Sequence, residues 1–267
     1  MSIIDKYNSR AEKVNSLVCV GLDSEYEKLP SFAKASAGEG RQFEFNKKII
    51  DQTHEYVASY KANIAFYEAR GDEGLRELKK TMDYLREKHP DIFLICDAKR
   101  GDIGNTNRGY IAEIFDWLGF DAMTLHPYFG RESIMPFLER KDKCSIILCR
   151  SSNPGAGELQ DLTVDEKPLW RVVAEKVHKE WNFNNNCMLM AGATYPEEMK
   201  KIRELVDDMT FLVPGIGAQG GNVKETVEAG LNSQKKGLII HSARGIIFSD
   251  DPKRETIRLY EEINRHR

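Results

Sequence analysis

The chain has 267 residues, of which 41% are hydrophobic and 30% charged, and its formal net charge is −3 at pH 7. This length and composition permit one large core and exclude a disordered chain. Acidic and basic residues are interspersed, so no basic stripe offers itself to nucleic acid, and no apolar run approaches the length that spans a membrane. Residues 1–6 lack the apolar core of a secretion signal, so we expect a cytoplasmic enzyme with a small-molecule ligand.

The cysteines predict no metal, redox or disulfide chemistry. They fall in or beside apolar runs, without a Cys-x-x-Cys pair, which favours buried small hydrophobic side chains. Their odd number also argues against a disulfide framework. The five are Cys19, Cys96, Cys144, Cys149 and Cys187.

Eight short apolar runs recur along the chain and predict eight strands. The runs are continuous rather than alternating, which is typical of parallel strands that are covered on both faces. They span residues 17–21, 58–61, 93–97, 122–125, 145–149, 188–190, 211–213 and 238–241.

Segments with helical spacing lie between these runs. Apolar residues at intervals of three and four predict helices at 75–85, 111–118 and 199–205, and a last helix begins near Pro252. No Gly-x-Gly-x-x-Gly fingerprint follows the first run, so the pattern favours a closed (β/α)8 TIM barrel of the α/β class over an open doubly wound sheet. No low-complexity linker divides the chain, and we expect a single domain over residues 1–267 with long loops at 31–40 and 153–161.

Charged residues stand where the first three runs end, and in a barrel that end carries the active site. Strand alternation places Asp97 and Lys99 on the same face after the third run, while Lys61 ends the second and Asp23 follows the first. Charges beside a buried run must be paired. The alternative for Asp97 with Lys99 is a structural salt bridge. The alternative for Lys61 is a solvated lysine, and the alternative for Asp23 is a helix cap.

Two loops near the end of the chain predict a phosphate site. The seventh run is followed by the glycine-rich residues 214–222, and the eighth by residues 241–245, which include Arg244. Glycines let backbone N–H groups approach phosphate oxygens, and an arginine offers a two-pronged contact. A simple turn is the alternative for the glycines, but the position after strands seven and eight is the usual phosphate site of a barrel.

These motifs resemble a known family. The string DAKRGDIGNT at 97–106 closely resembles the signature of the orotidine 5'-monophosphate decarboxylases, and PGIGAQGG at 214–221 resembles their phosphate loop. Further similarity at Asp23, at 61–63, at 152–156 and at Arg244 extends over nearly the whole chain. The longer first and fifth loops resemble a bacterial branch that is similar to the mycobacterial and plasmodial enzymes.

The resemblance implies decarboxylation of orotidine 5'-monophosphate to uridine 5'-monophosphate and CO2, the last step of de novo pyrimidine (UMP) biosynthesis, with no cofactor and no metal. Lys99 is then the proton donor to C6 of the pyrimidine, and Asp97 holds it. Lys61 and Asp102 complete an alternating chain of four charges, which titrate as a coupled set.

The resemblance also implies a homodimer with shared active sites, because residues that match Asp102, Ile103 and Thr106 reach the neighbouring subunit's site in relatives. It extends the expected substrate contacts to residues on several loops. The implied contacts are Asp23 and Thr106 for the ribose, Ser152 for the pyrimidine edge, Gly217, Gln219, Ala243 and Arg244 for the phosphate, and Asn63, Ile103 and Pro214 as further substrate-binding residues.

Several assignments stay open at this point. Ser151 stands beside Ser152, and either can contact the pyrimidine. His126, at the end of the fourth run, has no counterpart that the resemblance supplies, and we interpret it as site-lining or structural rather than catalytic. Residues 153–161 are the candidate lid, because closure over a substrate excludes water.

Two other functions compete with the decarboxylase. Hexulose-phosphate synthases and keto-gulonate-phosphate decarboxylases share an Asp-x-Lys-x-x-Asp core but use magnesium and sugar phosphates, and a catalytically dead nucleotide-binding barrel is the second rival. Arg100 to Gly101, Gly104 to Thr106 and Lys61 favour the pyrimidine enzyme over the first. Retention of all four charged residues argues against the second.

Overall fold

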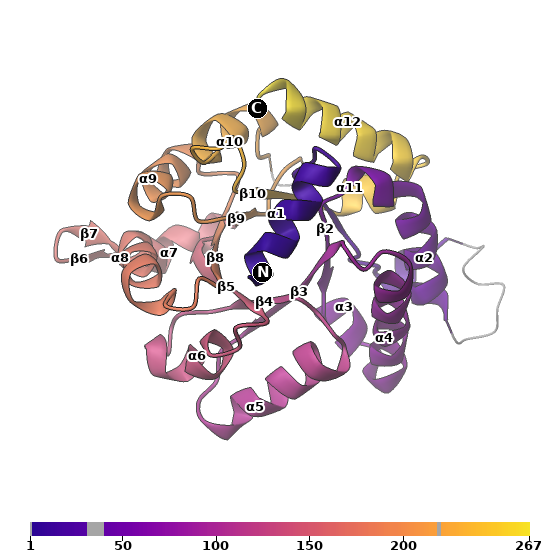
Figure 1. The fold of residues 1–267 in the computed structure, drawn as a ribbon, viewed down its shortest axis with the longest axis horizontal. Helices are drawn as coiled ribbons and strands as arrows, with labels where there is room; N and C mark the ends of the chain where they lie inside the picture. Colours follow the sequence, from indigo (N-terminus) through magenta and orange to yellow (C-terminus); the bar gives the residue numbers. More distant parts are fainter. Residues whose placement is uncertain (1, 31–39, 218–219) are drawn as a thin grey trace.

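A closed barrel of parallel strands forms the centre of the molecule (Figure 1). The computed structural model describes residues 2–30, 40–217 and 220–267. Consecutive barrel strands pair in chain order, and the last strand pairs back to the first. The predicted barrel and its eight runs are therefore confirmed. The strands are β1 (Val18–Gly21), β2 (Ser59–Asn63), β3 (Phe93–Arg100), β4 (Ala122–Leu125), β5 (Cys144–Arg150), β8 (Cys187–Ala191), β9 (Phe211–Val213) and β10 (Leu238–Ser242).

Helices surround the barrel and connect its strands (Figure 1). The helices expected at 75–85, 111–118 and 199–205 and near Pro252 are present, the second as an α-helix that continues into a π-helical segment. The α-helices are α1 (Ile3–Lys13), α2 (Arg41–Thr53), α3 (Ala65–Glu68), α4 (Gly71–Lys88), α5 (Asn105–Ile111), α6 (Gly130–Leu138), α7 (Gly157–Gln160), α8 (Leu169–Lys176), α9 (Pro196–Val206), α10 (Val223–Gly230), α11 (Arg244–Ile247) and α12 (Pro252–Arg265). The π-helical segments are η4 (Ala112–Trp117) and η6 (Val177–Trp181), and the 3-10 turns are η1 (Tyr26–Lys28), η3 (His54–Tyr56) and η5 (Pro154–Ala156).

The amino-terminal helix α1 closes one end of the barrel. Its Tyr7 is fully buried, stacks edge-on against Phe93 and donates a hydrogen bond to the carbonyl of Leu238. Both partners begin their strands, so α1 covers the amino-terminal ends. The carboxyl ends of the strands, at the other end of the barrel, are therefore open to the loops that follow them.

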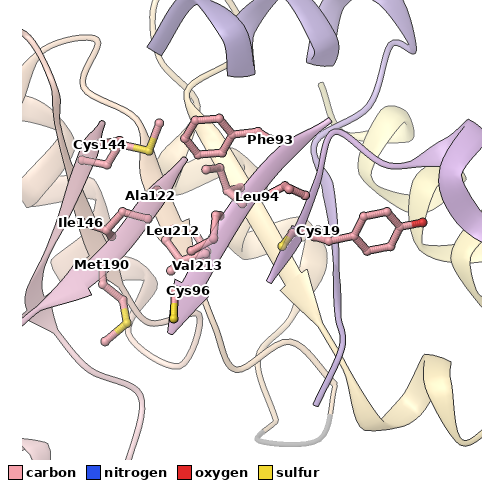
Figure 2. Packing of buried hydrophobic residues seen from close by; sticks show 14 of the residues in the cluster. Cys19, Phe93, Leu94, Cys96, Ala122, Cys144, Ile146, Met190, Leu212 and Val213 are labelled. Atoms are coloured by element: carbon pink, nitrogen blue, oxygen red, sulfur yellow. The ribbon is translucent and has the colours of Figure 1, made fainter. Parts of the chain in front are cut away.

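The core consists of the apolar residues of the strands and the inner faces of the helices. Figure 2 shows Cys19, Cys96 and Cys144 packed among these residues. All five cysteines are buried and none forms a disulfide, which confirms the prediction of buried thiols. Among the described residues, no helix is both long and apolar enough to cross a membrane.

The loop after β5 differs from the expectation. Residues 153–161 form the turn η5 and the short helix α7 rather than an irregular loop, and the antiparallel hairpin of β6 (Thr163–Val164) and β7 (Lys167–Pro168) follows. The hairpin has no apolar alternation that sequence could reveal, and its turn residues Asp165 and Glu166 both have positive φ without a glycine. Residues 31–39 of the other expected loop lie outside the described residues.

Candidate active site

A cavity of about 370 Å³ opens at the carboxyl ends of the barrel strands. Its size is within the range of small-molecule sites. Residues of β2, β3, β8 and β10 and of the segments after β1, β5, β9 and β10 contribute to the wall. The lining residues are Asp23, Lys61, Asn63, Asp97, Lys99, Ser151, Ser152, Asn153, Met190, Pro214, Gly215, Ile216, Gly217, His241, Ser242, Ala243, Arg244 and Gly245.

Lys61 lies between two carboxylates at the floor of this cavity. Its Nζ is 3.1 Å from Oδ2 of Asp97 and 3.6 Å from Oδ1 of Asp23, and its side chain is 3% exposed. Asp23 also accepts a hydrogen bond of 3.0 Å from the backbone N–H of Asn63. The alternative of a solvated lysine is therefore wrong for Lys61.

Burial and charge act against each other on these groups. Burial alone would lower the pKa of Lys61, but the carboxylates of Asp23 and Asp97 outweigh it and raise that pKa. Burial alone would raise the pKa of Asp97, but Lys61 and Lys99 hold it well below its usual range. Both groups are therefore charged at neutral pH.

Lys99 is the accessible member of the charged group. Its Nζ is 2.5 Å from Oδ1 of Asp97, and its side chain is 45% exposed at the cavity. The expected proximity to Asp97 is confirmed, but regular alternation is not its cause. Lys99 has a φ of +49°, and the β3–β4 pairing is interrupted between Cys96 and Arg100. An ammonium is thus presented to the cavity from an irregular strand end.

The opposite side of the cavity combines glycines with an arginine. Gly215 and Gly217 have φ values of +101° and +71°, which side chains rarely adopt, so the loop after β9 requires glycine there. Arg244 begins α11 and is exposed, and none of the ion pairs among the described residues includes it. The arrangement can receive an anion. Gln219 lies outside the described residues.

Three of the predicted residues do not reach this cavity within one chain. Asp102 and Ile103 lie on the loop after β3, Thr106 lies in the first turn of α5, and all three are absent from the lining. Asp102 accepts a hydrogen bond from the backbone N–H of Ile103, whose side chain is 59% exposed. The other predicted residues in the described part of the chain are brought together.

Ser151 and Ser152 both line the cavity, so the choice between them stays open. The hydroxyl of Ser151 accepts a hydrogen bond from the amide of Gln160 and donates one to Asn153. Gly192 packs against the backbone of Ser152, where a Cβ would clash. The segment is therefore held by its own loop and by β8.

Sequence reasoning did not assign roles to His241 and Thr124. His241 is 9% exposed, and its Nε2 has no hydrogen-bond partner in the described part of the chain. Burial followed by the charge of Lys61 lowers its pKa well below the usual value. Thr124 is fully buried and bonds to the end of β3. The position of His241 at a strand end was a usable signal, whereas a lone threonine inside an apolar run gave none.

The family model described as Orotidine 5'-phosphate decarboxylase / HUMPS family matches residues 16–259. The chain belongs to this family. The match covers every barrel strand, so the orotidine 5'-phosphate decarboxylase resemblance that the motifs indicated is confirmed.

Three similar proteins match this chain over nearly the whole length of both chains. The orotidine 5'-phosphate decarboxylase of Cellvibrio japonicus is 47% identical over 251 residues, which cover 94% of this chain and 91% of that protein. The solved structure of Leishmania donovani OMP decarboxylase is 38% identical with a TM-score of 0.88, covering 100% of this chain and 99% of that one. The Plasmodium berghei orotidine 5'-monophosphate decarboxylase is 26% identical with a TM-score of 0.86, covering 98% and 97%.

Proposed function

We propose that this chain, as one domain over residues 1–267, decarboxylates orotidine 5'-monophosphate to uridine 5'-monophosphate and CO2 without a cofactor. One observation supports this most directly: a single cavity holds a buried carboxylate between two lysines on one side and a glycine loop with Arg244 on the other. A phosphorylated pyrimidine nucleotide has the matching parts, an anionic phosphate at one end and a carboxylated ring at the other.

Lys99 is the group that we place at C6. When the bond to CO2 breaks, its electron pair stays on C6, and the ammonium of Lys99 stabilises that negative charge. Nζ then gives its proton to C6, which completes uridine 5'-monophosphate, and the amine regains a proton from water. Asp97 holds Nζ at 2.5 Å, and Lys61 keeps Asp97 ionised.

The remaining contacts bind and orient the nucleotide. Backbone N–H groups at Gly217 and Ala243 together with Arg244 bind the phosphate, far from C6, so that binding energy orders the reacting end. Arg244 is exposed and unpaired among the described residues, which suits an incoming anion. We further assign Asp23 and Thr106 to the ribose, Ser152 to the pyrimidine edge, Gln219 to the phosphate, and Asn63, Ile103 and Pro214 to substrate binding.

We also propose a homodimer in which Asp102 acts in the partner's site. Within one chain Asp102 is outside the cavity. The loops around it carry exposed apolar side chains, with Ile103, Tyr128 and Phe129 at least half exposed. Large exposed apolar groups at one end of a barrel are typical of an interface. A second copy would cover them and bring Asp102 to Lys99 of its neighbour.

Mixing two inactive variants tests the reaction and the shared site together. Lys99→Ala and Asp102→Asn homodimers are both expected to lose turnover of orotidine 5'-monophosphate. After denaturation and refolding as a mixture, one site of each heterodimer regains both residues, so random pairing restores about a quarter of wild-type activity. If the mixture stays inactive while refolded wild type recovers, Asp102 does not act across the interface.

A further inference from the structure

Thr124 of β4 occupies an irregular point of the barrel. Before it, Cys96 of β3 pairs with Met123, and after it Arg100 pairs with Leu125. Three β3 residues, 97 to 99, therefore lie opposite the single residue Thr124. Such a bulge leaves backbone groups of the longer strand without ladder partners.

The hydroxyl of Thr124 fills this gap. Its Oγ1 accepts hydrogen bonds from the backbone N–H groups of Ala98 at 3.0 Å and Lys99 at 2.9 Å. Its own O–H donates a hydrogen bond to Oδ1 of Asp97, 3.0 Å away. A hydroxyl has one donor and two acceptor positions, so all three are used.

The bulge and the hydroxyl together fix the direction of Lys99. A positive φ, which a lysine rarely adopts, requires support from the surroundings, and the bond from the Lys99 N–H to Thr124 supplies it. The same hydroxyl holds the carboxylate oxygen of Asp97 that contacts Nζ of Lys99. Thr124 is fully buried, so solvent does not reach its hydroxyl while the threonine is present.

We propose that Thr124 is a positioning residue for the decarboxylation, which holds the Asp97 carboxylate and the Lys99 backbone in the arrangement that aims Nζ at the reacting carbon. The inference rests on the proposed function. Thr124 touches no substrate, since it is absent from the cavity lining. Its effect therefore falls on the chemical step rather than on nucleotide binding.

Thr124→Val keeps the shape and removes the hydroxyl, Thr124→Ala removes both, and Thr124→Ser keeps the hydroxyl. We expect kcat for orotidine 5'-monophosphate to fall about 10- to 100-fold in Val and Ala, because small misplacement of a catalytic group has this cost. The dissociation constant of uridine 5'-monophosphate stays within about threefold, and Ser stays close to wild type.

Thr256→Val is the matched control. Thr256 is also fully buried, and its hydroxyl donates to the carbonyl of Pro252 within α12, away from the cavity. It is expected to lower the melting temperature without lowering kcat. Unchanged kcat in folded Thr124→Val or Thr124→Ala, or a Ser variant as slow as Val, would overturn the inference. A wild type without turnover would instead refute the proposed function. If neither the Val nor the Ala variant folds, the Ser variant decides: a lost kcat with intact binding of uridine 5'-monophosphate would contradict the positioning role.

Discussion

At the scale of single residues, Lys61 determines the charge balance of the cavity. It is the buried cation between Asp23 and Asp97. Without it, Asp23 would lose this ion pair and Asp97 would keep only the more exposed Lys99, although both carboxylates are poorly solvated. A buried charge that loses its partner lowers the free energy of unfolding several times more than a broken exposed ion pair does.

Lys61→Met is expected to lower the free energy of unfolding by about 3 to 5 kcal/mol, because it breaks a buried ion pair from one side. Urea unfolding at pH 7 measures it. Lys47→Met is the control, since Lys47 pairs with Asp51 at 2.8 Å on an exposed face and should cost less than about 1 kcal/mol. Equal losses in the two variants would show that Lys61 is not a buried compensating charge.

The buried imidazole of His241 is expected to make the stability of the protein depend on pH. Its pKa is lowered in the folded protein, mainly by burial and then by Lys61, so the imidazole is neutral there and takes up a proton on unfolding. The stabilisation is present above about pH 6.5, the usual value for an unfolded histidine, and is lost as the pH falls below it.

The wild-type free energy of unfolding should therefore fall more steeply from pH 7.5 to 5.5 than that of His241→Asn, by up to about 1.4 kcal/mol per pH unit. Urea titrations at several pH values give both slopes, and the slopes should coincide above pH 7.5. Parallel curves throughout the acid range would mean that folding does not lower the pKa of His241.

Charges that follow apolar runs predicted which side chains meet at the cavity, while the roles assigned to these side chains stay predictions. Asp97 and Lys99 were found in this way, although the cause of their proximity is a bulge rather than alternation. Thr124 was not found, because a threonine within a strand is an ordinary residue until its partners in the neighbouring strand are known. His241 was visible at a strand end, but its burial was not.

At the scale of elements, α2 depends on a neighbouring helix for its first turn. Gly40 precedes α2 and offers no side-chain cap. Glu77 of α4, which is buried, accepts hydrogen bonds from the backbone N–H groups of Gln42 and Phe43. It also pairs with Arg70. One carboxylate thus caps α2, interacts favourably with the dipole of that helix, and fixes the contact between α2 and α4.

Glu77→Leu is expected to cost about 3 to 5 kcal/mol of stability, because the cap is lost and Arg70 loses its buried carboxylate partner. Glu73, whose side chain is 61% exposed, is another partner of Arg70, and Glu73→Leu should cost under about 1 kcal/mol. Thermal unfolding compares the two. A Glu77 variant as stable as the Glu73 variant would contradict the cap.

The elements themselves were largely predictable. Continuous apolar runs gave all eight barrel strands, because buried parallel strands need apolar side chains on both faces. The hairpin of β6 and β7 was not predicted, since its short strands are exposed or half-buried and its turn lacks glycine. The cap by Glu77 depends on a contact between distant segments, which no local pattern contains.

At the scale of the whole molecule, the proposed dimer accounts for residues that one chain leaves unused. Asp102 lies outside the cavity, and Ile103 on its own loop and Tyr128 and Phe129 on the loop after the neighbouring strand β4 are exposed. The sequence indicated this only through its resemblance to a family, because a single chain's pattern does not distinguish an interface from an ordinary surface.

Phe129→Asp is expected to shift the protein toward monomers and to make turnover depend on protein concentration, because it places a charge in the proposed interface. Sedimentation velocity with parallel assays measures both. Phe183→Asp alters another half-exposed phenylalanine, which contacts Arg131, and should leave assembly and activity unchanged. A dimeric, fully active Phe129→Asp would place the interface elsewhere.

The proposed decarboxylation is tested by following the conversion of orotidine 5'-monophosphate by the purified protein in excess EDTA, comparing wild type with Lys99→Ala. The wild type is expected to release stoichiometric uridine 5'-monophosphate and CO2, and the folded variant to be slower by about 1,000-fold or more. A folded wild type that binds uridine 5'-monophosphate but releases no CO2, or whose turnover requires magnesium, would contradict it.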